Sequence, residues 1–572
     1  MTTNDMPPAD PWMDRFFEAY YRSRPVNATF VGERSFDGLL PDVSSEGVSR
    51  TVSDMRALLG DGPVDVPEAP CHDLTQLDRR VAEGFLRIQL WEHESRWQLG
   101  NPSAYAGEAV FGLMSLLLPG SAPGDGATEA LIGRMKGLDL FFTDARAHLR
   151  DAPVPWTERA LRECRGGLVF LREGLSRAQI PGADSEAFSG AVAEAITAFE
   201  EYSSFLESEL LHRPSERLSC GADALDLHIR EGHFLDRSAD EIAAYAREEI
   251  ASARSWLEEN ASECGGATPA EVLAQLPDAH PSAAGYVARY EDSWREMKAL
   301  SDERELVTWP DFPIRYAPRP EWSWAAAPDL YFLFYRSPAA IGRPPVHHYM
   351  IAPLRKGMSA AEEEAFLRAN NDSVIKLNHV VHHGGIGHHV QNWNAFRSPL
   401  RIGRMAAVDC SSRVAMFCGG TMAEGWACYA TDLMAEAGGL TPLEVFAEHA
   451  GRVRMAARAV VDVELHLGRM SLDDAARYYV ETAGMPEASG RAEAVKNSMF
   501  PGAALMYLVG TDMIHELRTD LMRILGDRFV LRDFHDDFLS YGSIPVRLVA
   551  DEMRSRATLG LPLNAHAQLG QS

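Results

Sequence analysis

The sequence comprises 572 residues, of which 46% are hydrophobic and 24% charged, as in ordinary soluble globular proteins. Acidic residues outnumber basic ones, 82 to 55, giving a net charge of −27. This charge argues against nucleic acid or an anionic membrane surface as a partner, because both are themselves negatively charged.

The N-terminal segment and the cysteines indicate a cytoplasmic protein. Residues 1–25 lack the basic start and apolar stretch of a secretory signal, and no apolar run approaches the ~18 residues of a membrane helix. The seven cysteines are scattered and include no CxxC pair, which fits a reducing compartment better than a disulfide framework. We therefore expect a cytoplasmic protein without a membrane partner.

Helical patterns dominate the chain. The segment 186–211 is rich in alanine and glutamate at helical spacing. Capping boxes, in which a serine or threonine is followed three residues later by glutamate, predict helices that begin at Ser238 and Thr441, and a further helix is expected to begin at Ser359. We predict a mostly α-helical protein.

Alternating apolar and polar residues, the pattern of a strand, are confined mainly to residues 305–353. We therefore predict one small β element near 305–353 within the helical architecture. No linker separates autonomous domains, so we expect a single domain over residues 1–572.

The segment 378–391, NHVVHHGGIGHHVQ, holds five of the chain's 19 histidines. His379 and His383 have the i, i+4 spacing of helical zinc ligands, but Val380 stands where the HExxH motif carries its glutamate. His382 is about 10 Å along an ideal helix from His389, too far for one metal ion. Only an irregular backbone at the three glycines could bring His382 close to His388 or His389.

A third ligand is expected about 35 residues later. Glu424 begins the helical run EGWACYAT, and two histidines on one helix with a glutamate on a later helix is the ligand layout of many catalytic zinc sites. Alone, this glutamate would be assigned to a helix cap or a solvated face. Its position after the histidine-rich segment makes it a candidate ligand.

These residues resemble a bacterial family, domain of unknown function 885, which is grouped with metallopeptidases related to angiotensin-converting enzyme and to the carboxypeptidase Taq type. The family's signatures HExxPGHHxQ and EGWAxYxE correspond here to HHGGIGHHVQ at 382–391 and EGWACYAT at 424–431. Further similar blocks lie at 24–44, 458–471, 500–518 and 534–549. The resemblance implies an almost wholly helical, zincin-related fold with a metal cleft between two subdomains, about 1–300 and 301–572.

The resemblance also implies roles for individual residues. His382, His388 and Glu424 would bind one divalent metal ion, zinc in the first instance and iron or manganese as alternatives, with His379 and His389 as additional ligands or supporting residues. Tyr507 would stabilise an oxyanion. The substrate would be a peptide or a small molecule, and Arg518 and Arg547 are candidates for binding its carboxylate.

The departures from the family motif place peptide hydrolysis in question. His383 replaces the glutamate that would act as general base, Thr431 replaces the second acid of EGWAxYxE, and Glu464 stands where DxGxH has glycine. His383 or Glu464 could serve as the base, or His383 could become a fourth protein ligand. Two histidines and one carboxylate also form the ligand set of non-haem iron enzymes.

Three hypotheses therefore stand. The first is a metal-dependent hydrolase of the peptidase or amidase type with His383 in place of the glutamate base. The second is a non-hydrolytic metalloenzyme, such as a lyase, an isomerase or a non-haem iron oxidative enzyme, that acts on a small specialised metabolite. The third is a catalytically inactive descendant that binds a ligand.

Overall fold

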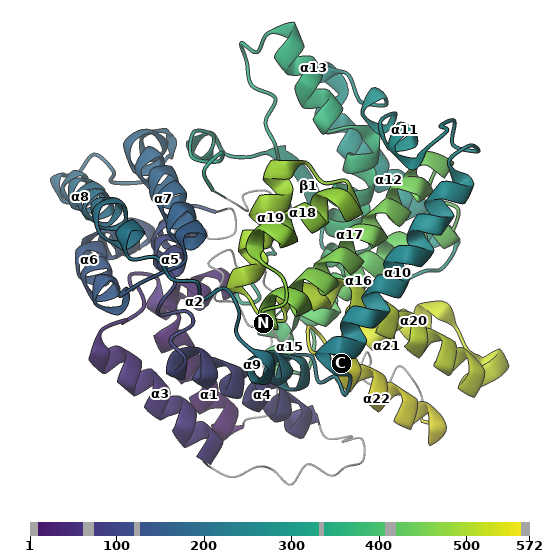
Figure 1. Ribbon diagram of the computed structural model, residues 1–572, viewed down its shortest axis with the longest axis horizontal. Helices are drawn as coiled ribbons and strands as arrows, with labels where there is room; N and C mark the ends of the chain where they lie inside the picture. Colours follow the sequence, from purple (N-terminus) through teal and green to yellow (C-terminus); the bar gives the residue numbers. More distant parts are fainter. Residues whose placement is uncertain (1–9, 61–73, 119–125, 331–336, 407–418, 562–572) are drawn as a thin grey trace.

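The structure, a computed structural model, describes residues 10–60, 74–118, 126–330, 337–406 and 419–561. Helices form most of it, as Figure 1 shows. The N-terminal helices are α1 (Pro11–Ser23), α2 (Pro25–Val31), α3 (Ser45–Gly60), α4 (Leu74–Glu94), α5 (Pro102–Ser115), α6 (Ala127–His148), α7 (Val154–Val169), α8 (Glu186–Ser208) and α9 (Ala222–Leu227).

The central part of the chain contains both strands and a π-helix. In chain order its elements are α10 (Ala239–Asn260), α11 (Pro269–Leu273), α12 (Tyr286–Glu303), β1 (Ile314–Pro318), β2 (His347–Ile351), α13 (Ala360–Ala369), the π-helix η9 (Val374–Gly384), α14 (His388–Ala395) and α15 (Arg401–Met405). The C-terminal elements are α16 (Gly420–Glu436), α17 (Pro442–His466), α18 (Leu472–Ala483), α19 (Glu487–Met499), α20 (Met506–Leu525), α21 (Leu531–Ser540) and α22 (Val546–Thr558).

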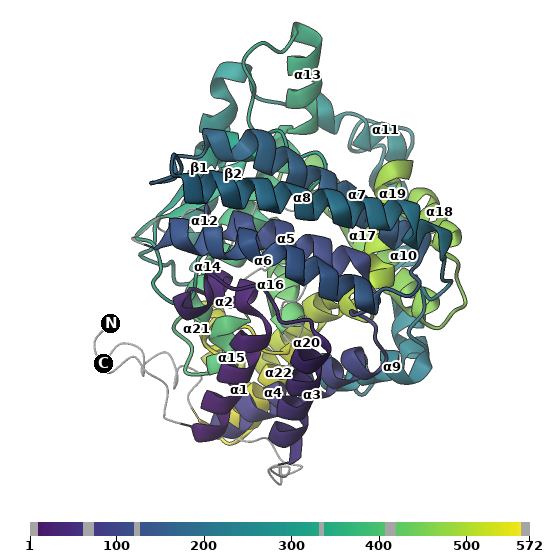
Figure 2. The ribbon, with the colours of Figure 1, turned by 90° about the vertical axis from the view of Figure 1, so that its left-hand side faces the viewer.

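Helices α5 to α8 form a layer on one side of the molecule, facing the viewer in Figure 2. α5 is apolar around its whole circumference, and nearly every residue from Pro102 to Ser115 is buried. A helix without a polar face must lie inside a protein. α5 accordingly packs against α6, α7 and the short helix α2.

The helix α10 links the first 300 residues to the C-terminal half by packing along α17. Both helices bury small side chains, including Ala246 and Ala253 on α10 and Ala456 and Ala457 on α17. Small side chains permit close approach of two helices. Residues before 300 thus contribute to both halves of the molecule, and the predicted division near 300 remains a prediction.

The predicted β element is confirmed as a two-stranded sheet. β1 and β2 run parallel, with Ile314 opposite His347 and Tyr316 opposite Tyr349. The tyrosine rings lie 5.1 Å apart, and both hydroxyls reach His379 on η9. The sheet therefore supports the π-helix that carries the histidine-rich segment.

The two predicted capping boxes are confirmed, and the helix expected at Ser359 begins with a third. Ser238, Ser359 and Thr441 each cap their helix, and the glutamate three residues later returns the hydrogen bond. Each such cap stabilises its helix by roughly 1 kcal/mol. The local sequence is thus sufficient to determine where α10, α13 and α17 begin.

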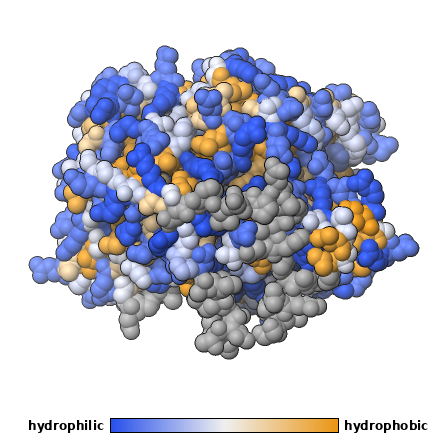
Figure 3. Space-filling view, turned by 90° about the horizontal axis from the view of Figure 1, so that it is seen from below, coloured by the Kyte–Doolittle hydropathy of each residue, from blue (hydrophilic) through white to orange (hydrophobic). Residues whose placement is uncertain are grey.

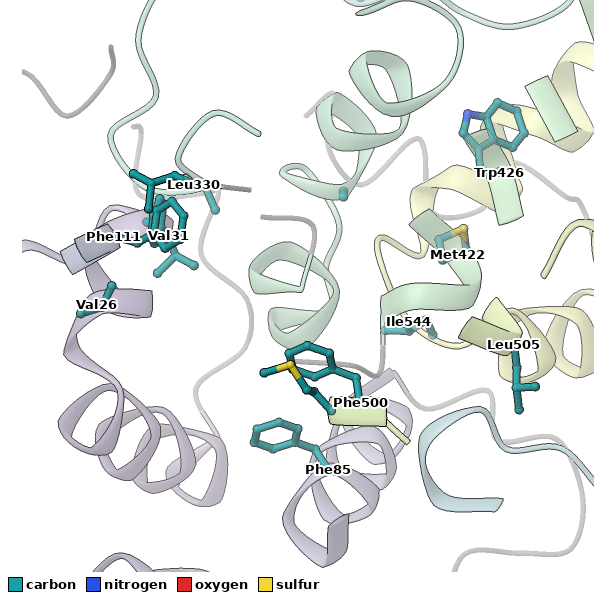
Figure 4. Close-up of a cluster of buried hydrophobic side chains, with 14 of the residues drawn as sticks. Val26, Val31, Phe85, Phe111, Leu330, Met422, Trp426, Phe500, Leu505 and Ile544 are labelled. Carbon is teal, nitrogen blue, oxygen red and sulfur yellow. The ribbon is translucent and has the colours of Figure 1, made fainter. Parts of the chain in front are cut away.

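Hydrophobic side chains from distant segments form one buried cluster extending from Trp12 to Ala557. Figure 4 shows Phe85 of α4 beside Phe500, and Met422 and Trp426 of α16 in the same cluster. The molecular face in Figure 3 is largely hydrophilic with small apolar patches, in keeping with the strongly negative charge.

Candidate metal centre

The backbone between η9 and α14 is irregular. Such irregularity is what the sequence requires for His382 to lie close to His388 or His389. η9 is a π-helix that ends at Gly384, and α14 starts at His388. Gly387 lies so close to His382 that a Cβ atom would stand 1.9 Å from the His382 carbonyl oxygen. Only glycine permits this approach.

Two tryptophans fix the glycine-containing turn between the helices. The indole Nε1 of Trp294 donates to the Gly384 carbonyl at 3.1 Å, and that of Trp426 donates to the Ile386 carbonyl at 2.9 Å. Trp294 lies on α12 and Trp426 on α16, where it is fully buried. Two neighbouring helices therefore hold the turn, and with it the histidines on either side.

Three imidazoles converge at this turn, and we call His382, His383 and His388 the histidine cluster. One ring nitrogen from each lies within 4.8 Å of the other two. The ring centroids of His382 and His388 are 5.0 Å apart, and those of His383 and His388 are 5.3 Å apart. The structure thus brings together His382 and His388, the two predicted ligands on this segment, and His383, which was predicted to stand in place of a glutamate base.

Glu424 reaches the histidine cluster from α16. Its Oε2 lies 3.4 Å from Nε2 of His382 and 3.8 Å from Nε2 of His388. This oxygen is buried and has no hydrogen bond of acceptable geometry. A buried carboxylate oxygen left in this state is costly unless it is paired with a cation.

Helix crossing determines how deeply Glu424 sits. Gly425 of α16 meets Gly510 of α20, where an added Cβ would stand 2.6 Å from the Gly510 carbonyl carbon. Two glycines at one crossing allow the helix backbones to touch, so the neighbouring Glu424 is held close to the crossing.

The protonation states of these groups suit metal ligands. Burial lowers the pKa of His388 to about 4, and burial lowers the pKa of His383 well below its usual value. Burial raises the pKa of Glu424, but the contact with His382 and the nearby guanidinium of Arg458 outweigh it and lower the pKa to about 2. Neutral imidazoles and an ionised carboxylate are the forms that bind metal ions.

The residues present therefore fit a divalent metal ion. His382, His388 and Glu424 offer two nitrogens and one oxygen, and His383 offers a further nitrogen. The Nδ1 atom of His383 is bound to the Asn378 carbonyl oxygen at 2.6 Å, which fixes the ring in the orientation typical of metal-bound histidine. This donor set suits zinc, iron or manganese.

The other two histidines of the segment have different surroundings. His379 bonds through Nδ1 to the Tyr349 hydroxyl at 2.7 Å, beside the histidine cluster. His389 is directed away from the cluster: its Nε2 bonds to the Phe312 carbonyl at 2.9 Å and its ring stacks on Phe312. The geometry thus selects His388 over His389 and leaves His379 in a supporting place.

Two further predicted site residues, Tyr507 and Glu464, lie in different surroundings. Tyr507, near the start of α20, lies 4.6 Å from the Arg458 guanidinium, measured to its ring centroid. Glu464 instead pairs with Arg247 of α10. The structure therefore puts Tyr507 in the surroundings of Glu424 through Arg458, whereas Glu464 is engaged by a different helix.

Both predicted carboxylate-binding arginines are already paired. Arg518 bonds to Glu436 at 2.8 Å and to the Tyr429 hydroxyl, and Arg547 pairs with Asp236 and Asp551. Sequence reasoning missed two arginines nearer the centre, Arg454 and Arg458. Their i, i+4 spacing on α17 was a readable signal, but it is also the spacing of an ordinary exposed helix face.

The motif that resembles DxGxH has a structural use here. Asp462 accepts hydrogen bonds from the backbone N–H groups of Gly502 and Ala504 at 3.0 and 2.8 Å. His466 bonds through Nε2 to the Asn497 carbonyl at 3.0 Å. These bonds fix the segment that leads into α20 and therefore the place of Tyr507.

Comparison with known proteins gives a family and a fold. Residues 25–553 match the family described as "Bacterial protein of unknown function (DUF885)". The structure is similar to that of a "putative lipoprotein of unknown function" from Shewanella oneidensis, with a TM-score of 0.74, 19% identity, and coverage of 95% of this chain and 100% of that one. It is also similar to "the putative lipoprotein" from Colwellia psychrerythraea, with a TM-score of 0.76, 18% identity, and coverage of 96% and 98%. Among curated proteins, none matches this chain.

These comparisons correct the predicted location. Both solved structures are described as those of a "putative lipoprotein", which contradicts the expectation of a cytoplasmic protein. The physical basis of that expectation was the cysteine pattern and the first 25 residues, and neither is specific to one compartment. Within the described parts of the chain, no helix combines the length and apolarity needed to cross a membrane.

Proposed function

This chain is a member of the DUF885 family, and we propose that it is a metal-dependent enzyme of the hydrolase type with a metallopeptidase-like fold. One divalent ion, zinc in the first instance, would be held by His382, His388 and Glu424. The substrate would be a peptide or a small molecule with an amide bond. The net charge of −27 argues against nucleic acid as a partner.

The observation that carries the proposal is the buried Oε2 of Glu424. It faces two imidazole nitrogens at 3.4 and 3.8 Å without a hydrogen bond of acceptable geometry. A buried, ionised carboxylate oxygen without a hydrogen bond is unfavourable in a folded protein unless a cation lies beside it. A divalent ion between this oxygen and the two imidazole nitrogens would supply that positive charge.

The chain's own groups would then divide the chemistry. A divalent ion would supply polarisation of a carbonyl group and a lowered pKa for water. His383, whose Nδ1 is bound to the Asn378 carbonyl, would accept a proton at Nε2 in place of the missing glutamate. Tyr507 would donate its phenolic hydrogen to a developing oxyanion. Glu464 is not assigned as the base, because it pairs with Arg247.

A second candidate is favoured by the position of His383 itself. Its ligand nitrogen lies within 4.8 Å of those of His382 and His388, so it could join them as a fourth protein ligand. Four protein ligands would close a tetrahedral zinc site, whereas a six-coordinate iron or manganese ion would retain open positions. The enzyme would then be a non-hydrolytic metalloenzyme acting on a small metabolite.

Metal analysis of the purified protein, followed by substitution of His383, tests both candidates. One zinc ion per chain with cleavage of amide substrates supports the hydrolase, and one redox-active iron ion supports the second candidate. A chain that binds no metal when offered zinc, iron or manganese would contradict both and favour a ligand-binding descendant.

His383→Glu provides the sharper measurement. It restores the family's glutamate, so a hydrolase should retain zinc and gain peptidase activity. His383→Ala should keep the metal if this histidine is a base and should weaken metal binding about 10-fold or more if it is a ligand. A His383→Glu variant that binds zinc yet cleaves no member of a broad peptide library would count against the hydrolase.

A further inference from the structure

Arg454 and Arg458 lie one turn apart on α17 and share a face of that helix. Arg458 is fully engaged: its Nε donates to Glu493 at 2.9 Å, and its guanidinium lies 4.6 Å from the centroid of the Tyr507 ring. Arg454 differs, because it has no hydrogen bond or ion pair with any residue that the structure describes. The two arginines therefore share a face of α17, but only Arg458 is paired with a carboxylate.

The environment of Arg454 is unusual for an unpaired surface arginine. The residue is exposed to solvent, yet the surrounding protein lowers the pKa of its guanidinium, with the charge of Arg458 adding to the effect. An exposed guanidinium without a carboxylate partner among the described residues can bind an anion from solution.

A series of neighbouring residues connects Arg454 to the candidate metal centre. Glu424 is next to Gly425, which crosses α20 at Gly510, and Tyr507 lies one turn before Gly510. The guanidinium of Arg458 sits on the Tyr507 ring and lowers the pKa of Glu424. The path from Glu424 to Arg454 thus consists of residues in contact or within one helical turn.

We propose that Arg454 is the residue that recognises an anionic group of the substrate, a carboxylate in the first instance, beside the metal-binding residues. This rests on the proposed metal-dependent function and narrows its substrate class to compounds that carry a negative charge near the reacting bond. Arg518 and Arg547, which the sequence suggested for this task, already bond to carboxylates of the chain itself.

The physical argument concerns what an unpaired guanidinium offers. It presents several N–H donors in one plane, which fits the two oxygens of a carboxylate, and charge-assisted bonds of this kind are stronger than neutral ones. Arg458 cannot compete for the same anion, because Glu493 occupies it. Tyr507, whose ring contacts Arg458, would be a neighbour of the bound anion on the same side of α17.

The test uses a pair of probes that differ in one charge. The carboxylate 3-phenyl-2-(sulfanylmethyl)propanoate and its primary carboxamide share a thiol for the metal ion, and their dissociation constants are measured calorimetrically on the zinc-loaded protein. We expect the wild type to prefer the carboxylate about 10-fold or more. Arg454→Gln should abolish this preference without changing the affinity for the carboxamide, and Arg454→Lys should retain part of it.

The matched control is Arg477→Gln. Arg477 is exposed on α18 and pairs with Asp474, so its substitution removes the same charge away from the centre and should leave the preference intact. Zinc content is measured separately for every variant. Two results would overturn the anion site but not the metal centre. In the first, the zinc-loaded wild type shows no preference for the carboxylate. In the second, zinc-loaded Arg454→Gln keeps the full preference. A wild-type chain that binds no zinc, iron or manganese would overturn the proposed function and the anion site together.

Discussion

The histidine cluster and the corner where α17 ends both place histidine and a carboxylate among buried side chains. At the corner, Asp462 accepts two backbone N–H groups and His466 bonds to the Asn497 carbonyl. At the cluster, three imidazoles and Glu424 face one another, and the buried carboxylate oxygen has no hydrogen bond. The two carboxylates differ in their partners: backbone N–H groups bind Asp462, whereas the buried Oε2 of Glu424 faces imidazole nitrogens without a hydrogen bond.

The contrast teaches how to separate structural from functional polar residues in this chain. Both regions lie in blocks that resemble the family's motifs, so resemblance alone does not distinguish them. The distinction comes from the partners: a buried polar group whose bonds end on the backbone stabilises the fold. A buried carboxylate oxygen that faces imidazole nitrogens without a hydrogen bond is available to a ligand.

The largest expected effect is the loss of metal from the histidine cluster. In the double variant His382→Gln and His388→Gln, two ligands are gone, so metal content should fall from one ion per chain to none. Elemental analysis of protein dialysed against zinc measures this. His389→Gln is the control and should keep its metal, because His389 bonds to the Phe312 carbonyl. A double variant that retains one zinc ion per chain would contradict the proposal that the histidine cluster binds the metal ion.

The corner should respond in stability and not in metal content. Asp462→Ala leaves two buried backbone N–H groups without acceptors, so we expect the free energy of unfolding to fall by about 2–5 kcal/mol. Urea denaturation of the metal-free protein measures the change. Asp473, which is exposed on α18, serves as the control, since Asp473→Ala should change stability by about 0.5 kcal/mol or less. Equal effects of the two substitutions would show that Asp462 does not support the fold.

Gly387→Ala tests how tightly the turn holds the cluster together. The added methyl group would meet the His382 carbonyl oxygen at 1.9 Å, so the backbone must shift. We expect a loss of about 2–3 kcal/mol in stability and at least a tenfold weaker affinity for zinc. Competition with a coloured chelator gives the affinity. Gly190→Ala, at a helical position with no atom within 4 Å of the added methyl group, is the matched control. An unchanged affinity in Gly387→Ala would mean that the cluster does not depend on this close approach.

The smallest effect concerns a structural histidine and its pH dependence. His535 is buried between the Leu306 carbonyl and the Tyr429 hydroxyl, and burial lowers its pKa to about 3. Because the unfolded histidine titrates near 6.5, the stability due to neutral His535 is complete above that pH and is lost as the pH falls toward 3. The advantage of the wild type over His535→Gln should therefore shrink by about 2 kcal/mol between pH 7 and pH 5.

Urea denaturation of both metal-free proteins at a series of pH values measures this difference. Taking the difference between two proteins cancels the other titrating groups that they share. An advantage that stays constant or grows as the pH falls would show that His535 is not held neutral by the fold.

Much of the fold was readable from local sequence. The caps at Ser238 and Thr441 act within one helical turn, so no distant residue was needed to predict them. The β element near 305–353 was also readable, but the parallel pairing of β1 with β2 was not, because pairing joins segments about 30 residues apart. The choice between His388 and His389 likewise depended on a turn that has no repeating pattern.

The sequence by itself determined the helical class, the family, the histidine-rich segment and the candidate partner Glu424. These follow from residue types and from spacing along one element, where geometry repeats at each turn. Only the tertiary structure decided that His383 joins His382 and His388, that Glu464 is engaged by Arg247, and that Arg454 stands unpaired beside the centre. The physical reason is that each of these facts depends on which helices touch, and helix contacts arise from packing between distant segments of the chain.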